Sequence, residues 1–324
     1  MYAILKALIR TYYHIAEHRF AVETSNPDIF SVMSNYEPFQ ESSAETALQC
    51  NSNVIFTLRV EQYNLLSETE RKEYAHVFTD NSEADMPRIE VYHREKNDQR
   101  EAGWLLRVSI IAHLPICCEI ECDSTFENGI LHIANDCQDV HFCIDNALML
   151  LYAFRTAPLM TLEMHAAVVV RPCIEIRGEE RGYLFLGHSG TGKSTHARQW
   201  LAAFEDAWLL NDDNPILRVM DNGEIRVYGS PWSGKTPCYK NAYARVGGIV
   251  KLTQAPYNNI RFTSLPEAYA YMLSSASGLK IDRHMSDCLY ESIKQIITHV
   301  PCCLLECLPN TEAAEVCYKG IKKQ

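Results

Sequence analysis

The first half of the chain carries short runs in which apolar and polar residues alternate, which is the pattern of strands half-buried in a sheet. Residues 118–122 (C-E-I-E-C) alternate strictly, and residues 54–56 (V-I-F) have the composition of a strand. This pattern predicts strands at residues 14–22, 53–60, 88–92, 104–111, 117–122 and 129–133. Polar stretches at residues 41–45 and 96–101 are expected to be loops. The first half is therefore predicted to be rich in β-structure.

The second half alternates apolar, strand-like runs with segments of helical spacing. Strands are predicted at residues 165–170, 173–177, 182–186, 207–210, 224–228, 247–252 and 302–307. One helix is predicted at residues 145–159, at the end of the first half, and helices of the second half are predicted at residues 193–204, 264–274, 285–299 and 311–322. Alternation of this kind is typical of α/β domains. We therefore predict a β-rich α+β domain at residues 1–160 and an α/β domain at residues 161–324.

Charge and hydropathy narrow the classes of partner. The 324 residues carry a formal net charge of −11, so no excess positive field is present to attract nucleic acid or an anionic membrane. The longest apolar stretch, at residues 147–154, is far too short to span a bilayer. We therefore expect neither nucleic acid nor a membrane among the partners.

The chain has thirteen cysteines, an odd number, which include the adjacent pairs Cys117-Cys118 and Cys302-Cys303. The N-terminus lacks the cleavage-site pattern of a secretory signal, so free thiols in a reducing cytoplasm are expected. Zinc is the alternative, because Cys117, Cys118 and Cys122 are close in sequence. The chain has no C-x-x-C pairs at zinc-ribbon spacing, however, and this favours free thiols.

Residues 187–194 (G-H-S-G-T-G-K-S) match the phosphate-binding pattern G-x-x-x-x-G-K-[ST] at every fixed position. Glycines allow the backbone N–H groups to approach phosphate oxygens, Lys193 places a positive charge beside the β- and γ-phosphates, and the Ser194 hydroxyl can ligate Mg²⁺. The predicted strand before this segment and the predicted helix after it provide the required setting. The sequence thus predicts an ATP site formed by Gly187, Ser189, Gly190, Thr191, Gly192, Lys193, Ser194 and Thr195.

Two adjacent acids, Asp212 and Asp213, follow the apolar run at residues 207–210. A carboxylate at the end of a strand can hold Mg²⁺ in such a site, while a second can accept a proton from an attacking hydroxyl. The alternative is a simple turn, since N-D-D-N-P is also turn composition. His165 begins another predicted strand, where a lone histidine is either a structural group or a ligand.

Together these segments resemble a known nucleotide-binding core. M-H-A (164–166), L-F-L-G-H-S-G-T-G-K-S-T (184–195) and D-D (212–213) are similar in order and spacing to the ATP-dependent phosphoenolpyruvate carboxykinases and to the HPr serine kinase/phosphorylase group. The resemblance covers residues 162–214. It implies a mixed-sheet P-loop nucleotide-binding domain, with Lys193 on the terminal phosphates and His165 on the metal or acceptor side. It further implies Ser194 and Asp213 at Mg²⁺ and Asp212 as general base, although the roles of the two acids could be reversed.

Residues 229–235 (G-S-P-W-S-G-K) resemble a Pro-Trp loop of the kinase-like relatives. Small residues around a lysine suit a mobile flap that brings positive charge to the transferred group, and Lys235 is the candidate for that charge. The alternative is a surface turn anchored by Trp232.

The chain departs from both families in ways that bear on the reaction. It is much shorter than a carboxykinase, and Thr195 stands where HPr kinases usually have glutamate. These departures argue against decarboxylating chemistry and against HPr as the substrate. From the glycine-rich segment, the acid pair and the resemblance, we predict an enzyme, a kinase that uses ATP and Mg²⁺ to phosphorylate a hydroxyl on a small protein or a small metabolite. The alternatives are a non-catalytic ATP-binding regulatory or accessory protein and a carboxykinase-like lyase. Related kinases form oligomers, so the resemblance also implies a homo-oligomer.

Overall fold

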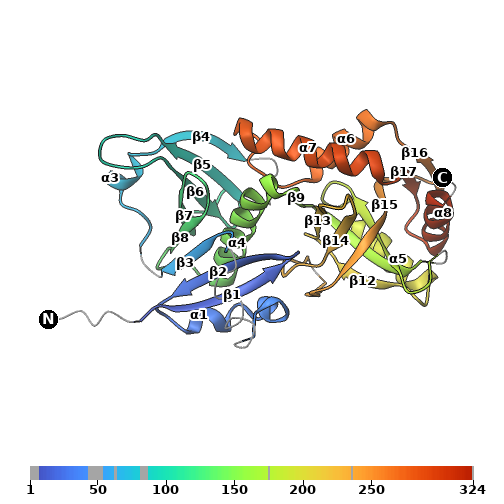
Figure 1. Ribbon diagram of the computed structural model, residues 1–324, viewed down its shortest axis with the longest axis horizontal. Coiled ribbons are helices and arrows are strands. Elements are labelled where there is room, and N and C mark those ends of the chain that lie inside the picture. Colours follow the sequence, from blue (N-terminus) through green and yellow to red (C-terminus); the bar gives the residue numbers. More distant parts are fainter. Residues whose placement is uncertain are drawn as a thin grey trace. The chain divides into compact units, whose positions relative to one another are not determined.

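The computed structural model describes residues 7–42, 54–61, 64–80, 87–173, 176–234 and 236–322. The chain is a mixed α/β protein that divides into two compact units, Met1–Arg155 and Thr156–Gln324. Each unit contains its own mixed β-sheet, and helices connect or follow the strands of each sheet in the sequence (Figure 1).

The first unit is dominated by an eight-stranded sheet in the order β1-β2-β3-β8-β7-β6-β5-β4. Strand β3 pairs in parallel with β2 and with β8, whereas the other neighbours are antiparallel. The elements are β1 (Ile9–Ile15), β2 (His18–Thr24), α1 (Asp28–Ser31), η1 (Ser34–Phe39), β3 (Thr57–Glu61), α3 (Glu68–Arg71), β4 (Ala75–Asp80), β5 (Arg88–Arg94), β6 (Gly103–Ser109), β7 (Cys118–Asp123), β8 (Asn128–Ile133) and α4 (Val140–Thr156).

This sheet curls into a half-barrel around helix α4 (Figure 1). The Tyr152 hydroxyl of α4 donates a hydrogen bond to the Ile15 carbonyl of β1 at 3.0 Å. Farther along the sheet, a Cβ on Gly129 of β8 would lie 2.8 Å from the Leu151 side chain, so the glycine allows helix and sheet to approach closely. The apolar face of α4 is thus the core around which the strands wrap.

The strand predicted at residues 14–22 is wrong in one respect, because the structure has two strands there. β1 and β2 form an antiparallel hairpin, and Ala16 and Glu17 at its turn have φ of 48° and 64°. Tight hairpin turns need positive φ, for which glycine or asparagine is the usual signal. The sequence carries neither, so the apolar run reads as continuous.

The second unit holds a nine-stranded sheet whose main path runs β12-β10-β11-β15-β14-β13-β9, with β17 beside β15 and β16 beside β17. The elements are η2 (Ala157–Leu159), β9 (Thr161–Glu163), β10 (Ala166–Pro172), β11 (Glu180–Leu186), α5 (Lys193–Ala203), β12 (Trp208–Asn211), β13 (Ile216–Val219), β14 (Ile225–Tyr228), β15 (Tyr243–Gln254), β16 (Asn259–Phe262), α6 (Leu265–Ser275), α7 (Arg283–His299), β17 (Cys302–Cys307) and α8 (Thr311–Ile321).

Helices α5 and α8 cover one face of this sheet. Trp200 of α5 is fully buried and contacts Tyr183 and Phe185 of β11 and Tyr318 of α8, with ring centroids 4.9, 5.3 and 5.7 Å apart. Truncating a buried tryptophan typically costs about 3–5 kcal/mol. This aromatic cluster fixes α5 against the strand that precedes it, and so positions the start of the helix.

Most elements predicted for the second half are confirmed, including β11, α5, α6, α7, β17 and α8. The strand predicted at residues 173–177 is wrong for the part that can be judged. Residues 174 and 175 lie outside the described residues, while Cys173 and Ile176 belong to the connection between β10 and β11. Ile176 is 47% exposed, so the apolar residue that suggested a buried strand lies at the surface.

Three strands of the second unit, β9, β13 and β16, were not predicted, and each has only three or four residues. Among the helices that the structure describes, none combines the length and apolar character needed to cross a membrane.

Candidate functional site

The segment between β11 and α5, which we call the glycine loop (residues 187–192), leads directly into the first turn of a helix. Gly190 has a φ of 75°, and Gly192 has a φ of 106° at the N-cap of α5. Residues with a side chain rarely adopt such values, so glycine is required for this path. Ser189 is exposed, whereas Thr191, Ser194 and Thr195 are half-buried. Free N–H groups at a helix start make this a suitable place for an anion.

Lys193, the first residue of α5, turns its amine back toward the glycine loop and is 8% exposed. Its Nζ donates to the carbonyl oxygens of Gly187 at 3.0 Å and His188 at 3.4 Å. The same atom lies 2.7 Å from Nε2 of His165, 28 residues earlier in the chain. The structure therefore brings two of the predicted site residues into direct contact.

His165 lies between β9 and β10 and links the lysine to the acids. An ammonium group can only donate, so Nε2 of His165 accepts and Nδ1 carries the proton. Nδ1 lies 3.1 Å from Oδ1 of Asp213 and donates to it. Both ring nitrogens are thus engaged, and His165 could ligate a cation only after it released Lys193 or Asp213. The arrangement is a hydrogen-bonded series from Lys193 through His165 to Asp213.

Asp212 and Asp213, the acid pair, follow β12. The Asp213 carbonyl accepts a hydrogen bond from the Ala166 N–H at 2.8 Å, and Asn211 Oδ1 accepts from the N–H of Asp213 at 2.9 Å. These bonds hold the turn beside the start of β10. Asp212 is only 5% exposed, and its Oδ1 has no hydrogen-bond partner among the described residues. A buried carboxylate oxygen without a partner is costly, which marks Asp212 as a candidate for binding or chemistry.

Residues 229–234, which we call the tryptophan loop, pack onto the acid pair. Asn211 Nδ2 donates to the Trp232 carbonyl at 3.0 Å and to Ser230 Oγ at 3.1 Å. A Cβ on Gly234 would lie 3.0 Å from the Asp212 carbonyl oxygen, so small residues are needed at this point. Lys235 itself lies outside the described residues.

Glu163 of β9 is a site residue that sequence reasoning missed. It is fully buried, and its Oε2 has no hydrogen-bond partner among the described residues. Burial raises the pKa of Glu163 well above its ordinary value, and the nearby Asp213 charge raises it further. The sequence gives only a weak indication that Glu163 belongs to the site, because it is a single acid two residues before His165 in the run L-E-M-H.

A pocket of about 560 Å³ borders the glycine loop and the start of α5. Gln254, at the end of β15, donates from Nε2 to the Gly190 and Thr191 carbonyls at 3.4 and 3.3 Å. His196 at the pocket wall accepts from Trp200 Nε1 at 3.0 Å, and burial lowers the His196 pKa to about 4, so the ring is neutral. The lining is mixed and mainly apolar: Gly190, Thr191, Gly192, Thr195, His196, Leu252, Gln254, Ala255, Pro256, Cys307, Leu308 and Pro309.

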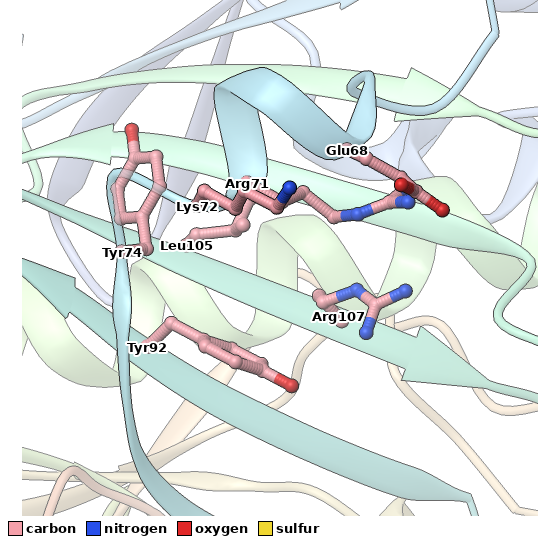
Figure 2. Close-up of a pocket in the computed structure, with 7 residues that line it drawn as sticks. All are labelled: Glu68, Arg71, Lys72, Tyr74, Tyr92, Leu105 and Arg107. Atoms are coloured by element: carbon pink, nitrogen blue, oxygen red, sulfur yellow. The ribbon is translucent and has the colours of Figure 1, made fainter.

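The first unit has an open pocket of about 340 Å³ between α3 and strands β5 and β6 (Figure 2). Arg107 in this pocket is paired with Glu119 at 2.8 Å and with Glu90 at 2.9 Å. Arg71 lies 3.6 Å from Glu119 as well. Because carboxylates already neutralise these two arginines, the pocket does not single out an anionic ligand.

The arrangement in the second unit places a lysine, a histidine and two acids around one end of the glycine loop. Carboxylate and hydroxyl oxygens, such as those of Asp212, Asp213 and Ser194, are the hard ligands that Mg²⁺ prefers. No family model matches the chain, and no curated protein matches its sequence.

Proposed function

We propose that the chain is an ATP-dependent kinase that transfers the γ-phosphoryl group to a hydroxyl acceptor. Its second unit would be a P-loop nucleotide-binding domain of the phosphoenolpyruvate carboxykinase and HPr kinase type. The observation that carries the proposal is the contact series from Lys193 Nζ through His165 to Asp213, at 2.7 and 3.1 Å. It joins three segments that are distant in sequence and that the resemblance groups into one site.

In this proposal the glycine loop binds the phosphates of ATP. Its N–H groups and Lys193 would contact the β- and γ-phosphate oxygens, and the lysine would exchange its carbonyl partners for them. Ser194 and Asp213 would hold Mg²⁺, which would neutralise charge on the phosphate oxygens. Lys235 would add positive charge beside the transferred group, as proposed from the sequence.

Asp212 is the proposed general base. It would accept the proton of the acceptor hydroxyl while that oxygen forms a bond to the γ-phosphorus, and the bond to the leaving ADP oxygen breaks. Asp212 is buried and its Oδ1 has no hydrogen-bond partner among the described residues, which supports this role because the oxygen could accept from a substrate. The transition state of phosphoryl transfer needs positioning and charge more than covalent chemistry.

The pocket beside the glycine loop is the proposed place for the nucleoside. Its walls combine apolar side chains with the Gln254 amide, a common composition for sites that hold a flat, partly polar ligand. The proposed acceptor is a serine of a small protein or a small metabolite, and the proposed location of the reaction is the cytoplasm. A homo-oligomer is part of the same proposal, on analogy alone.

The direct test is transfer of labelled γ-phosphate from Mg·ATP to a panel of peptides, small proteins and hydroxylated metabolites. We expect a labelled acceptor, with labelling lost when Mg²⁺ is chelated. Lys193→Met should abolish it, while Lys294→Met, which replaces an exposed lysine of α7, should not.

The other outcomes separate the alternatives. Tight ATP binding without turnover across the whole panel would favour a non-catalytic ATP-binding protein. Consumption of ATP that depends on oxaloacetate would favour a carboxykinase-like lyase. Failure of the purified chain to bind Mg·ATP at all would overturn every reading of the glycine loop as a nucleotide site.

A further inference from the structure

Four thiols gather in the first unit, near the start of β7 and the start of α4. Cys117 comes just before β7, Cys118 is its first residue, and Cys143 lies in the first turn of α4. All three are buried, and their Sγ atoms lie within 4.8 Å of one another. Half-buried Cys137, in the turn between β8 and α4, has its Sγ 3.5 Å from that of Cys143. We call these four residues the cysteine cluster.

Backbone hydrogen bonds fix the cluster. The Cys117 N–H donates to the Val108 carbonyl at 2.8 Å, and the Cys117 carbonyl accepts from the Ala134 N–H at 2.9 Å. The Cys137 N–H in turn donates to the Ala134 carbonyl at 3.0 Å. The thiols therefore converge because the pairing of β6, β7 and β8 and the turn after β8 bring their backbones together.

The distances fit coordination of a metal ion. A disulfide needs its sulfurs about 2.0 Å apart, so the 3.5 Å between Cys137 and Cys143 belongs to free thiols. In a tetrahedral zinc site with Zn–S bonds of about 2.3 Å, ligand sulfurs lie roughly 3.8 Å from one another. The 3.5 Å between Cys137 and Cys143 is close to that value, and the Sγ atoms of Cys117, Cys118 and Cys143 lie within 4.8 Å of one another, so rotation of the side chains would bring the four sulfurs to coordinating distance.

We propose that the cysteine cluster is a structural zinc site. Soft thiolates select zinc over the hard cations, and a site closed by four cysteine ligands, three of them buried, leaves no open position for catalysis. Each ligating thiol releases its proton to solvent and replaces its S–H bond with a bond to the metal. The ion ties β7 and the turn after β8 to α4, which is the core helix of the half-barrel.

The spacing explains why sequence reasoning favours free thiols. The ligands follow C-C-x18-C-x5-C, which has no C-x-x-C pair, and they meet only because β7 and β8 pair in register. Cys122, the third member of the sequence-based zinc alternative, is not in the cluster. It lies four residues along the strand from Cys118, roughly 13 Å away at a rise of about 3.3 Å per residue.

The test is the metal content of the full chain, purified with reductant and desalted. We expect one zinc ion per chain, and the same content in Cys122→Ala, which removes an equally buried thiol of β7 outside the cluster. Cys143→Ser should lose the metal, and Cys137→Ser should bind it at least tenfold more weakly. Replacement by Co²⁺ should produce thiolate-to-cobalt charge-transfer bands and the visible bands of a tetrahedral site.

If Cys143→Ser does not fold, the metal content of the wild type alone decides whether the zinc site exists. Reduced wild-type protein that takes up neither zinc nor cobalt in one-to-one ratio would overturn the proposal. Reduced protein that binds no metal, yet forms a Cys137–Cys143 disulfide on exposure to air, would replace it with a redox pair. Loss of kinase activity is not used as a readout, so this test is independent of the function proposed for the second unit.

Discussion

Lys193 is a buried cation whose amine lies within hydrogen-bonding distance of two carbonyl oxygens and an imidazole nitrogen. His165 connects this amine to Asp213. In the proposed function, phosphate oxygens of ATP would take the place of the two carbonyl oxygens.

Asp212→Asn tests the base directly. The amide has nearly the same shape but cannot accept the hydroxyl proton, so we expect phosphoryl transfer to fall by about 10²–10⁴. Affinity for ATP should change little. Asp221→Asn, which alters an exposed acid in the turn after β13, is the matched control for loss of charge.

The measurement is single-turnover transfer, with the ATP dissociation constant measured separately. Transfer at the wild-type rate in Asp212→Asn would remove this residue from the chemistry. If Asp213→Asn instead lowers transfer while Asp212→Asn weakens Mg²⁺ binding, the two roles are reversed.

Glu163→Gln tests the buried acid through the pH dependence of stability. Burial raises the pKa of Glu163 above the ordinary value of 4.5, so the folded chain keeps a proton that the unfolded chain releases. The wild type therefore loses stability as pH rises above about 4.5, by at most about 1.4 kcal/mol per pH unit from this group. Glutamine cannot ionise and removes that loss.

We expect Glu163→Gln to be the more stable protein at pH 8, with the advantage shrinking toward pH 4. Urea unfolding across this range measures the difference, and Glu205→Gln, at an exposed position, should show none. A constant difference between Glu163→Gln and wild type at all pH values would show that Glu163 does not titrate as described.

At the scale of elements, the glycine loop can be probed with a matched pair of glycines. Gly190 and Gly223 have φ of 75° and 82°, and a Cβ at either would meet no atom within 4 Å. Alanine at each should therefore cost about 1–2 kcal/mol of stability from the left-handed backbone alone. Only Gly190→Ala should also weaken ATP binding, up to roughly tenfold, because relaxing the strain turns the loop N–H groups away from the phosphates.

Thermal unfolding and nucleotide titration of the two variants make this comparison. Equal affinity for ATP in Gly190→Ala, Gly223→Ala and wild type would separate the glycine loop from nucleotide binding. Equal losses of stability would confirm that the two positions are matched.

The sequence predicts those elements whose burial pattern is local. Helix α7 is an example, because Met285, Leu289, Ile293 and Ile296 form one buried face and Asp282 caps its start. The glycine loop is similarly local, since eight consecutive residues carry its pattern. The hairpin turn at Ala16 and Glu17 was missed because neither residue signals positive φ.

Site residues that come together only through contacts between distant segments could not be predicted from their spacing in the sequence. Glu163 becomes a buried site residue only when β9 pairs with β13. Cys143, which contacts Cys137, approaches Cys117 and Cys118 only after β7 and β8 form their ladder. The pocket residue Gln254 ends β15, and Pro309 follows β17. They approach the glycine loop because β15 pairs in parallel with both β11 and β17.

At the scale of the whole molecule, each unit has its own sheet and its own buried core. The site proposed for Mg·ATP uses residues of Thr156–Gln324 alone, and that unit contains the aromatic cluster that positions α5. The cysteine cluster uses residues of Met1–Arg155 alone. The two proposals can therefore fail separately.

This separation predicts that residues 156–324, expressed alone, fold and bind Mg·ATP. A sheet of nine strands covered by α5 and α8 supplies a core of its own, so unfolding by urea should be cooperative. Because a ligand that binds only the folded state stabilises it, Mg·ATP at 100 times its dissociation constant should add about 2.7 kcal/mol. The same fragment with Lys193→Met should unfold cooperatively without this gain. A folded fragment that fails to bind ATP, while the full chain binds it, would place part of the nucleotide site in residues 1–155.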